Sequence, residues 1–548
     1  MNTSKTKFDR VLSILFPFVF ILLTAVLLWK CRYGFPYEES FYAVTAYRFA
    51  TGDLPLIHEW HLSQLCFIYL APAVGCFLKI AGGTEGIFLF LRILYTVTWA
   101  MFSLFTWFRL RKISNAGAIA VSLAVLMYAP AGQMAICYNT VGVMMLLMSS
   151  VIVITAERVK KIQFVIAGIL YAIAVTCCPY LAVLFIPCIV FAVREVVRKK
   201  DKEWMFFVLG VMIMFAAFLI FFLARAPLGE YLEILPKILN DSEHQGSFIG
   251  KAGDYFLAVI QSTIPTAIIL VMAIGTAAYC VYKKSEKAKT AGFVITCVLT
   301  MLLFLSFKIQ NNLINYYMFI PAVLGIISLI CLNDELNKKL FIFMWVPGVV
   351  YSLCLHMSSN MRFVAISTAM TVASAAAIIM AARYAATIKQ GKAGTITLAA
   401  VMILTFGCIA ERRIVYVFGD NNFIYDTEYI DHGVAKGLYV TPEWKEKYDS
   451  MCTDIAPVKD SSSERKVFIL SSEIWLYLEV DKEIAAPTSW TSVLSPGLLD
   501  DYYGTHSDRR PDVIYLDGTY SGLADQFKLQ YYDGEKTSED AYILYPTS

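Results

Sequence analysis

The sequence predicts a mainly α-helical, polytopic membrane protein with a small α/β domain at its C-terminal end. Of the 548 residues, 58% are hydrophobic and only 16% are charged. Apolar runs of about 20 residues, the length that crosses a bilayer as a helix, recur up to residue 411. Beyond that position, short β-rich runs alternate with polar segments, as in a soluble domain.

The composition also restricts the partners. The formal net charge is +3, which indicates neither a nucleic-acid partner nor an acidic one. The 13 cysteines lie mostly inside apolar segments, a pattern typical of small buried hydrophobic residues rather than of a disulfide framework or a metal cluster. The lipid bilayer is therefore the one partner that the composition itself requires.

The first apolar run, residues 11–29, follows a basic lead and is longer than the apolar core of a signal peptide. No small-x-small cleavage site follows, since the next residues are Lys30-Cys31-Arg32-Tyr33. We therefore expect an uncleaved first span with a cytoplasmic N-terminus.

Loop charge sets the number of the remaining spans. If the apolar residues 65–81 crossed the membrane, the basic loop at 109–112 would lie outside. If residues 65–81 instead form an interfacial or re-entrant helix on the outer side, every strongly basic loop becomes cytoplasmic. About thirteen spans then remain, and the odd number places the C-terminus outside the cell membrane. The expected spans are 11–30, 86–110, 115–131, 140–156, 162–178, 181–195, 204–224, 255–281, 290–307, 314–332, 339–356, 363–383 and 394–411.

The change in composition divides the chain into a membrane domain, 1–411, and an extracytoplasmic domain, 412–548. A helix is expected after Thr441, a good N-cap that is followed by Pro442 in the first turn. Continuous apolar strands separated by helices predict an α/β arrangement. The expected strands are residues 466–470, 475–479 and 512–516.

The outer segment after the first span, residues 31–85, contains the main candidates for catalysis. Glu38 and Glu39 follow the membrane anchor directly, and a helix over 36–52 would place Tyr42 one turn after Glu38. A carboxylate near the interface, with its pKa free to rise, can accept a proton from an attacking hydroxyl or can bind a metal. The alternative is that two acidic residues simply start a helix, where the helix dipole favours them.

Two further groups of acids and histidines lie on the same side. His58, Glu59 and His61 offer carboxylate or imidazole to a divalent cation, or a cation to a phosphate. Asp241 and His244 form a second group in the next large outer loop, which favours one composite site. The spacing matches no known metal motif, and a loop that is merely exposed to water remains the alternative for both groups.

Other polar residues lie at the outer ends of the spans. Lys308 and Arg362 can pair with an anionic lipid phosphate, and Asn139 lies in a short polar loop on the same side. For each cation the alternative is a side chain that extends to the interface for solvation alone. The cytoplasmic loops contain no Gly-rich phosphate motif, which argues against a nucleotide-driven pump and a nucleotide-sugar enzyme.

Four short motifs follow one another in the first 110 residues. They are Pro36-Tyr37-Glu38-Glu39-Ser40-Phe41-Tyr42, Thr51-Gly52-Asp53, Glu59-Trp60-His61-Leu62 and Phe90-Leu91-Arg92. Their order resembles that in the membrane glycosyltransferases of the GT-C type that use polyprenyl-phosphate sugars, such as protein O-mannosyltransferases and aminoarabinose transferases. The acidic pair differs from that family by an extra residue and by Glu in place of Asp, and the paired prolines after the second acidic motif are missing.

The resemblance implies a GT-C-like fold and an inverting transfer of a sugar from a polyprenyl-phosphate donor to a hydroxyl of a glycan, lipid or protein acceptor on the outer face. Glu38, with Glu39 beside it, falls at the catalytic base, and His61 falls near the donor phosphate. The other candidates for binding the donor phosphate or substrate are His58, Tyr42, Lys308, Arg362 and Asn139. The candidate ligands of a divalent cation are Glu59, His244 and Asp241.

Two other functions stay open at this point. A lipid-linked glycan transporter or flippase should carry charges near the middle of its spans, and the expected spans hold almost none. A membrane polymerase of glycan repeats would use chemistry close to that of the transferase.

Overall fold

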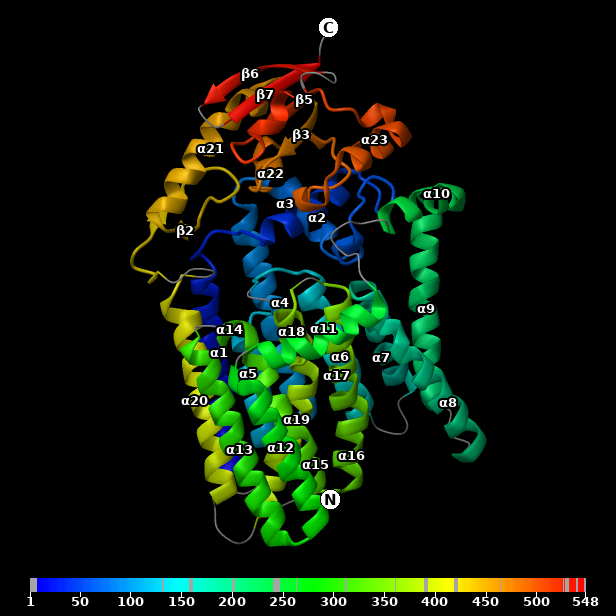
Figure 1. Ribbon diagram of the computed structural model, residues 1–548, viewed down its shortest axis with the longest axis vertical. Helices are drawn as coiled ribbons and strands as arrows, with labels where there is room; N and C mark the ends of the chain where they lie inside the picture. The colour runs from blue at the N-terminus through cyan, green and yellow to red at the C-terminus, as the bar shows by residue number, and fades with distance from the viewer. Residues whose placement is uncertain are drawn as a thin grey trace.

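The computed structural model is dominated by helices, which form a bundle below a sheet-containing region (Figure 1). The structure describes residues 7–130, 133–156, 161–199, 203–239, 247–262, 264–310, 313–359, 361–388, 393–417, 422–463, 465–525, 527, 532–538 and 541–546.

Nine helices in the described part of the chain are long and apolar enough to cross a membrane, or up to eleven if each of two bent helix pairs forms one span. The elements that make up the nine are α1 (Lys7–Lys30), α4 (Ile87–Leu110), α6 (Tyr138–Thr155), η3 (Pro179–Leu184) with α8 (Phe185–Lys199), α9 (Glu203–Leu223), α12 (Ile264–Lys283), α13 (Glu286–Ile309), α16 (Glu335–Leu340) continued by η5 (Phe341–Trp345) and α17 (Val346–Met357), and α20 (Ala393–Val415). The protein is therefore a multi-pass membrane protein. The predicted number of thirteen spans is not confirmed.

Several expected spans are shorter or broken. Three apolar segments have fewer than 18 residues: α5 (Asn115–Met127), α7 (Lys161–Cys177) and η4 (Tyr317–Val323) with α15 (Leu324–Cys331), which follows α14 (Leu313–Tyr316). The expected span 255–281 is divided between α11 (Phe248–Gln261) and α12. Pro265 fits the first turn of α12, where its missing N–H costs nothing, but it could not continue α11. The expected span 363–383 consists of α18 (Phe363–Ala369) and α19 (Thr371–Thr387), which meet at 50°.

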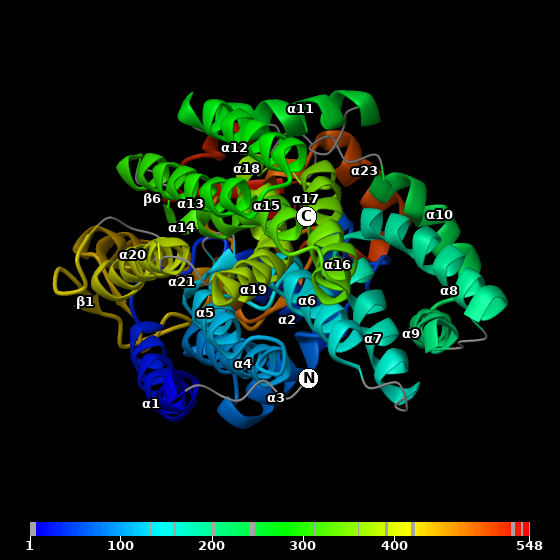
Figure 2. The same cartoon turned by 90° about the horizontal axis from the view of Figure 1, so that it is seen from below.

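Helices α7 and α9 pack through two glycines. A Cβ added at Gly168 would lie 2.1 Å from the carbonyl oxygen of Phe207, and one added at Gly210 would lie 2.1 Å from that of Val165. Small residues let helix backbones approach closely, which is how helices associate where water supplies no driving force. Helices α8, α9 and α10 (Leu228–Leu239) lie together on the side of the bundle away from α1 and α20 (Figures 1 and 2).

Residues 31–85, here called the first outer segment after the side of the membrane predicted for them, form three short helices between the bundle and the sheet. They are α2 (Glu39–Thr51), η1 (Leu62–Ile68) and α3 (Ala71–Ala81). Helix α2 is the predicted helix over 36–52, and all its residues from Glu39 to Arg48 are buried. The axes of η1 and α3 differ by 59°. Because 11 residues of helix span only roughly 16 Å, α3 by itself is too short to cross a hydrocarbon core of roughly 30 Å.

Residues 422–546, here called the C-terminal region, contain a five-stranded mixed sheet in the order β4-β3-β5-β7-β6. Strand β3 (Lys466–Leu470) is parallel to β4 (Glu483–Ile484) and β5 (Val513–Leu516), whereas β7 (Ala541–Pro546) is antiparallel to β5 and to β6 (Tyr532–Ser538). A separate antiparallel pair joins β1 (Glu428–Tyr429) to β2 (Tyr439–Val440). The helices of the region are α21 (Pro442–Asp460), α22 (Leu476–Val480) and α23 (Pro496–Thr505).

Most of the expected elements of this region form. Strands β3 and β5 fall on two of the expected strands, and α21 begins at Pro442 after Thr441. The strand expected at 475–479 is wrong, because this segment is the short helix α22. Parallel neighbours such as β3 and β4 need a crossover between them, and α22 supplies it. The hydroxyl of Tyr477 fixes the crossover to β3, since it donates to the carbonyl of Ile469 at 3.0 Å.

The C-terminal region is bound directly to the first outer segment. The backbones of Gly34 and Arg32 pair with that of Tyr439 through two hydrogen bonds, at 2.8 and 2.7 Å. The N–H of Gly86 donates to the carbonyl of Gly433 at 3.0 Å, and the N–H of Trp60 donates to that of Pro487 at 2.7 Å. These bonds place the first outer segment between the helix bundle and the sheet (Figure 1).

Candidate active site

Glu38 lies at the N-cap of α2 and is only partly buried. Its carboxylate accepts a hydrogen bond from Nε2 of Gln133, and Oε1 of the same amide accepts one from the hydroxyl of Tyr42 at 3.0 Å. Burial raises the pKa of Glu38, and the neighbouring charge of Glu39 raises it further, whereas the bond from Gln133 lowers it. The outcome is a carboxylate that is more basic than usual, oriented by an amide, and still reachable.

Glu39 has a different environment from its neighbour. One carboxylate oxygen lies 2.7 Å from Nε of Arg92, and the other accepts a bond of 2.8 Å from the N–H of Met134. Arg92 is buried, and it also donates to the carbonyl of Gly34 at 2.7 Å. Glu39 was predicted with Glu38 as catalytic, but its two oxygens hold α2, α4 and the segment before α6 together. The structure therefore gives Glu39 an anchoring position.

Arg48 is the centre of a buried ionic network that follows α2. Its guanidinium lies 2.6 Å from Asp53 and 2.7 Å from Glu59, and it donates to the carbonyls of His58 and Ala486 at 2.7 and 2.9 Å. Burial acts to raise the pKa of Asp53, but Arg48 and Arg509 outweigh it and hold that pKa below its ordinary value. The pKa of Glu59, which is fully buried, is raised by burial despite Arg48.

The predicted metal role of Glu59 does not fit these contacts. Its carboxylate is paired with Arg48 and also accepts from the N–H of His61 at 3.2 Å. A divalent cation beside a buried guanidinium would be repelled. Asp241 and His244, the other candidate ligands, lie outside the described residues. Within the part of the chain that the structure describes, no three His, Cys, Asp or Glu side chains are grouped to hold a metal.

The two predicted phosphate-binding histidines are held in the same network. Nδ1 of His58 accepts from the N–H of Leu54 at 3.0 Å and lies 3.1 Å from Arg509. Burial and the charge of Arg509 lower the pKa of His58 to about 4, so this ring is neutral near pH 7 and offers no charge to a phosphate. His61 is buried at the start of η1, where Nδ1 accepts from the N–H of Ser63 at 3.2 Å. Its ring lies 5.0 Å from that of Phe41 in an edge-to-face contact.

Of the other predicted site residues, Tyr42 shares the partner of Glu38, and Asn139 lies in the first turn of α6. Tyr42 bonds Gln133, and its ring lies 5.9 Å from that of Tyr138, the neighbour of Asn139. Asn139 is fully buried, and its side-chain carbonyl has no hydrogen-bond partner among the described residues. A buried polar atom of this kind is costly unless something satisfies it, such as a substrate.

Lys308 and Arg362 do not join this group. Lys308 lies 3.3 Å from Glu411, with both side chains partly exposed. Arg362 pairs with Asp254 at 3.0 Å, and the same carboxylate lies 3.4 Å from Nε2 of His356. Each predicted cation is thus already paired with a carboxylate.

A cluster of cations, of which only Arg92 stands in one of the sequence motifs, lies beside the acidic pair. Lys30, Arg92, Arg412 and Arg413 interact electrostatically near the ends of α1, α4 and α20, and Glu39 interacts with Arg92 and Arg413. Lys30, Arg92 and Arg413 are at most 7% exposed, and Lys30 donates to the carbonyl of Tyr416. Cations at or near the ends of three expected spans were the available signal, because charged residues near apolar spans often mark a substrate path or a buried partner.

Comparisons with known proteins found similarity in structure but none in sequence family. No protein-family model matches the chain, and no curated protein matches its sequence. The structure of ArnT from Cupriavidus metallidurans bound to undecaprenyl phosphate is similar over 98% of this chain and 98% of its own, with 13% identity and a TM-score of 0.43. The archaeal oligosaccharyltransferase AglB from Archaeoglobus fulgidus, in complex with an inhibitory peptide and a dolichol-phosphate, is similar over 98% of this chain and 74% of its own, with 11% identity and a TM-score of 0.40.

Both likenesses concern the overall chain path only. Both TM-scores are below 0.5 and both identities are below 25%, so neither neighbour carries an argument about the reaction of this chain. Its function follows from its own side chains.

Proposed function

We propose that this protein is an inverting glycosyltransferase that moves a sugar from a polyprenyl-phosphate donor to an acceptor hydroxyl at the outer face of the membrane. The observation that carries the proposal is Glu38, a partly buried carboxylate with a raised pKa that is oriented by Gln133 at the start of α2.

Glu38 supplies the base of this reaction. The acceptor hydroxyl gives its proton to the carboxylate as its oxygen forms a bond to the anomeric carbon of the donor. The bond from that carbon to the phosphate oxygen breaks on the opposite face, and the lipid phosphate leaves with the electron pair. Configuration at the anomeric carbon therefore inverts. The raised pKa of Glu38 makes it a better proton acceptor.

The cation cluster supplies the complementary charge. Lys30, Arg92 and Arg413 lie near the ends of α1, α4 and α20, and Glu39 interacts with Arg92 and Arg413. Preorganised positive charge in a site that excludes water stabilises an anionic leaving group as its charge develops. We assign the donor phosphate to this cluster, and its lipid tail to the surrounding bilayer.

Purified protein with a polyprenyl-phosphate sugar tests the proposal. Glu38→Gln keeps the size of the side chain and removes the base, so transfer should fall at least about 100-fold. Glu85→Gln is the matched control, because Glu85 is an exposed glutamate of the same outer segment that pairs with Lys436 at 3.1 Å. Unchanged turnover in Glu38→Gln, with melting temperatures equal in all three proteins, would rule out Glu38 as the base.

A further inference from the structure

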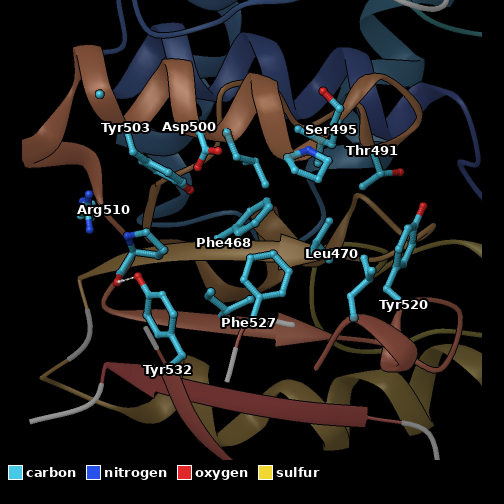
Figure 3. Close-up of a pocket in the computed structure, with 17 residues that line it drawn as sticks. Phe468, Leu470, Thr491, Ser495, Asp500, Tyr503, Arg510, Tyr520, Phe527 and Tyr532 are labelled. Carbon is cyan, nitrogen blue, oxygen red and sulfur yellow. Dashed lines mark hydrogen bonds between the residues drawn. The ribbon is translucent and has the colours of Figure 1, made fainter. Parts of the chain in front are cut away.

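The C-terminal region contains a cavity of about 230 Å³ between helix α23 and the sheet. Figure 3 shows Phe468 and Phe527 at its centre, α23 along one side with Asp500 and Tyr503, and Tyr532 on the other side. Arg510 and Tyr520 lie at opposite ends of the cavity in this view (Figure 3). None of these residues belongs to the group around Glu38.

The lining combines aromatic rings with a polar rim. Five aromatic side chains face the cavity: Phe468, Tyr503, Tyr520, Phe527 and Tyr532. Asp500 and Arg510 are exposed at its edge, together with the hydroxyls of Thr491 and Ser495. The rim therefore presents acceptors, donors and both signs of charge around an apolar floor.

This combination selects one class of ligand. A sugar ring presents C–H groups on its faces, which pack on aromatic rings, and hydroxyls at its edge, which both donate and accept hydrogen bonds. A lipid chain offers no hydrogen-bonding group to the polar rim of the cavity. The volume is below the roughly 300–1,000 Å³ of pockets for drug-sized ligands, so there is room for a single ring.

The segments that line the cavity also contact the first outer segment. The ring of Trp490, next to Thr491, lies 4.6 Å from that of Phe41 on α2 and 5.8 Å from that of His61. Tyr503 donates to the carbonyl of Ala485 at 2.7 Å, and its neighbour Tyr502 donates to the carbonyl of His58 at 3.2 Å. The segments around Trp490 and Tyr503 therefore both line the cavity or adjoin it and contact the first outer segment, which contains Glu38.

We infer that this cavity binds one sugar ring of a glycan acceptor, an assignment that rests on the proposed transferase function. The acceptor is then a glycan rather than a lipid or a protein. The C-terminal region holds a ring of the acceptor at a distance from the reacting hydroxyl, and the first outer segment carries the base.

Two glycines of α23 provide a matched pair of variants. A Cβ added at Gly504 or at Gly497 meets no atom within 4 Å, so neither substitution clashes with the fold at that point. Both glycines are exposed, but Gly504 lines the cavity and Gly497 does not. Gly504→Trp should therefore obstruct the cavity, and Gly497→Trp should leave it open. Tyr520→Ala removes an aromatic wall as a second, independent variant.

The measurement is saturation-transfer NMR on the full-length protein in nanodiscs. The probes are the methyl glycosides of glucose, galactose, mannose and N-acetylglucosamine, with N-acetylphenylalanine amide as a peptide-like probe. At least one glycoside should receive saturation from the wild type and from Gly497→Trp, and the signal should fall at least fivefold in Gly504→Trp and in Tyr520→Ala. No transfer to any glycoside, equal transfer in Gly504→Trp, or transfer to the peptide-like probe alone would overturn the assignment.

Glu38→Gln separates this inference from the proposed function. In that variant the glycoside should still bind while sugar transfer is lost. Binding in a protein that never transfers sugar would refute the transferase and leave the cavity a sugar site. Transfer that depends on Glu38 but is unaffected by Gly504→Trp would leave the transferase intact and refute the role of the cavity.

Discussion

Arg509 of the C-terminal region lies 2.6 Å from the carboxylate of Asp53 in the first outer segment, and Asp53 in turn lies 2.6 Å from Arg48 at the end of α2. Two arginines that are far apart in sequence therefore share one buried carboxylate. Through it, the C-terminal region helps to set the position of the helix that begins at Glu38.

Arg509→Ala should loosen this connection. Asp53 keeps Arg48 as a partner, so we expect a loss of about 1–3 kcal/mol of stability rather than unfolding. The charge of Arg509 also lowers the pKa of His58, so that pKa should rise from about 4 in the variant. NMR titration of His58 together with the melting temperature checks both effects. Arg465→Ala, at an exposed arginine of the same region, should change neither, and an unmoved His58 titration would contradict the contact.

Gln133→Leu should shift the pH dependence of transfer. The base must be ionised, so activity is present above the pKa of Glu38 and lost as the pH falls through it. The bond from Gln133 lowers that pKa, and its removal should move the acidic limb of kcat/KM up by about 0.5–1 pH unit. Gln310→Leu, at an exposed glutamine, is the control. An unchanged acidic limb would show that Gln133 does not affect the pKa of the catalytic base.

Glu39→Gln should act on stability, unlike Glu38→Gln. It leaves the buried guanidinium of Arg92 without its carboxylate, which should cost about 3–5 kcal/mol. Thermal unfolding in detergent, measured beside Glu38→Gln, distinguishes the two glutamates. If Glu39→Gln and Glu38→Gln had the same melting temperature and lost sugar transfer equally, Glu39 would be catalytic after all.

Arg413→Ala should weaken binding of the donor. With one cation fewer beside Glu39, KM for the polyprenyl-phosphate sugar should rise about tenfold, and Arg413→Lys should restore most of the affinity. Lys283→Ala, at an exposed lysine at the end of α12, should leave KM unchanged. A KM that is the same in Arg413→Ala as in the wild type would place the phosphate elsewhere.

The orientation predicted from loop charge can be measured on intact cells. Ser463 is exposed in the C-terminal region, and Lys287 is exposed near the start of α13. A membrane-impermeant maleimide should label Ser463→Cys directly and Lys287→Cys only after permeabilisation, above the background of the 13 native cysteines. The opposite labelling pattern would show that the protein has the inverse orientation, with Glu38 on the cytoplasmic side.

The sequence was informative where the determinants are local. The apolar runs predicted most of the long helices, the acidic pair marked the start of α2, and Thr441-Pro442 marked the start of α21. It also predicted a helix over 65–81 within the first outer segment, where η1 and α3 now lie, and the prediction that this helix does not cross the membrane stays a prediction. In each case a few neighbouring residues carry the information.

Local sequence patterns did not predict the contacts that define the site. Gln133 is 95 residues from Glu38, and Arg509 is 456 residues from Asp53. Neither partner stands in a motif, so only the folded chain shows which carboxylate is held by an amide and which by a guanidinium. The strand predicted at 475–479 failed for a related reason, because the need for a crossover between β3 and β4 overrides the local pattern.

The network around Arg48 also has a consequence for the order in which the protein matures. Arg48, Asp53 and Glu59 are synthesised early, but two of their partners, Ala486 and Arg509, are separated from them by 438 and 456 residues. Until those residues leave the ribosome, the charged side chains of the first outer segment lack some of their partners. Burying them would then be costly, so they should stay exposed to water. A chain that stops before Arg509 should therefore insert its helices and still lack a finished active site, so that the segment made first is completed last.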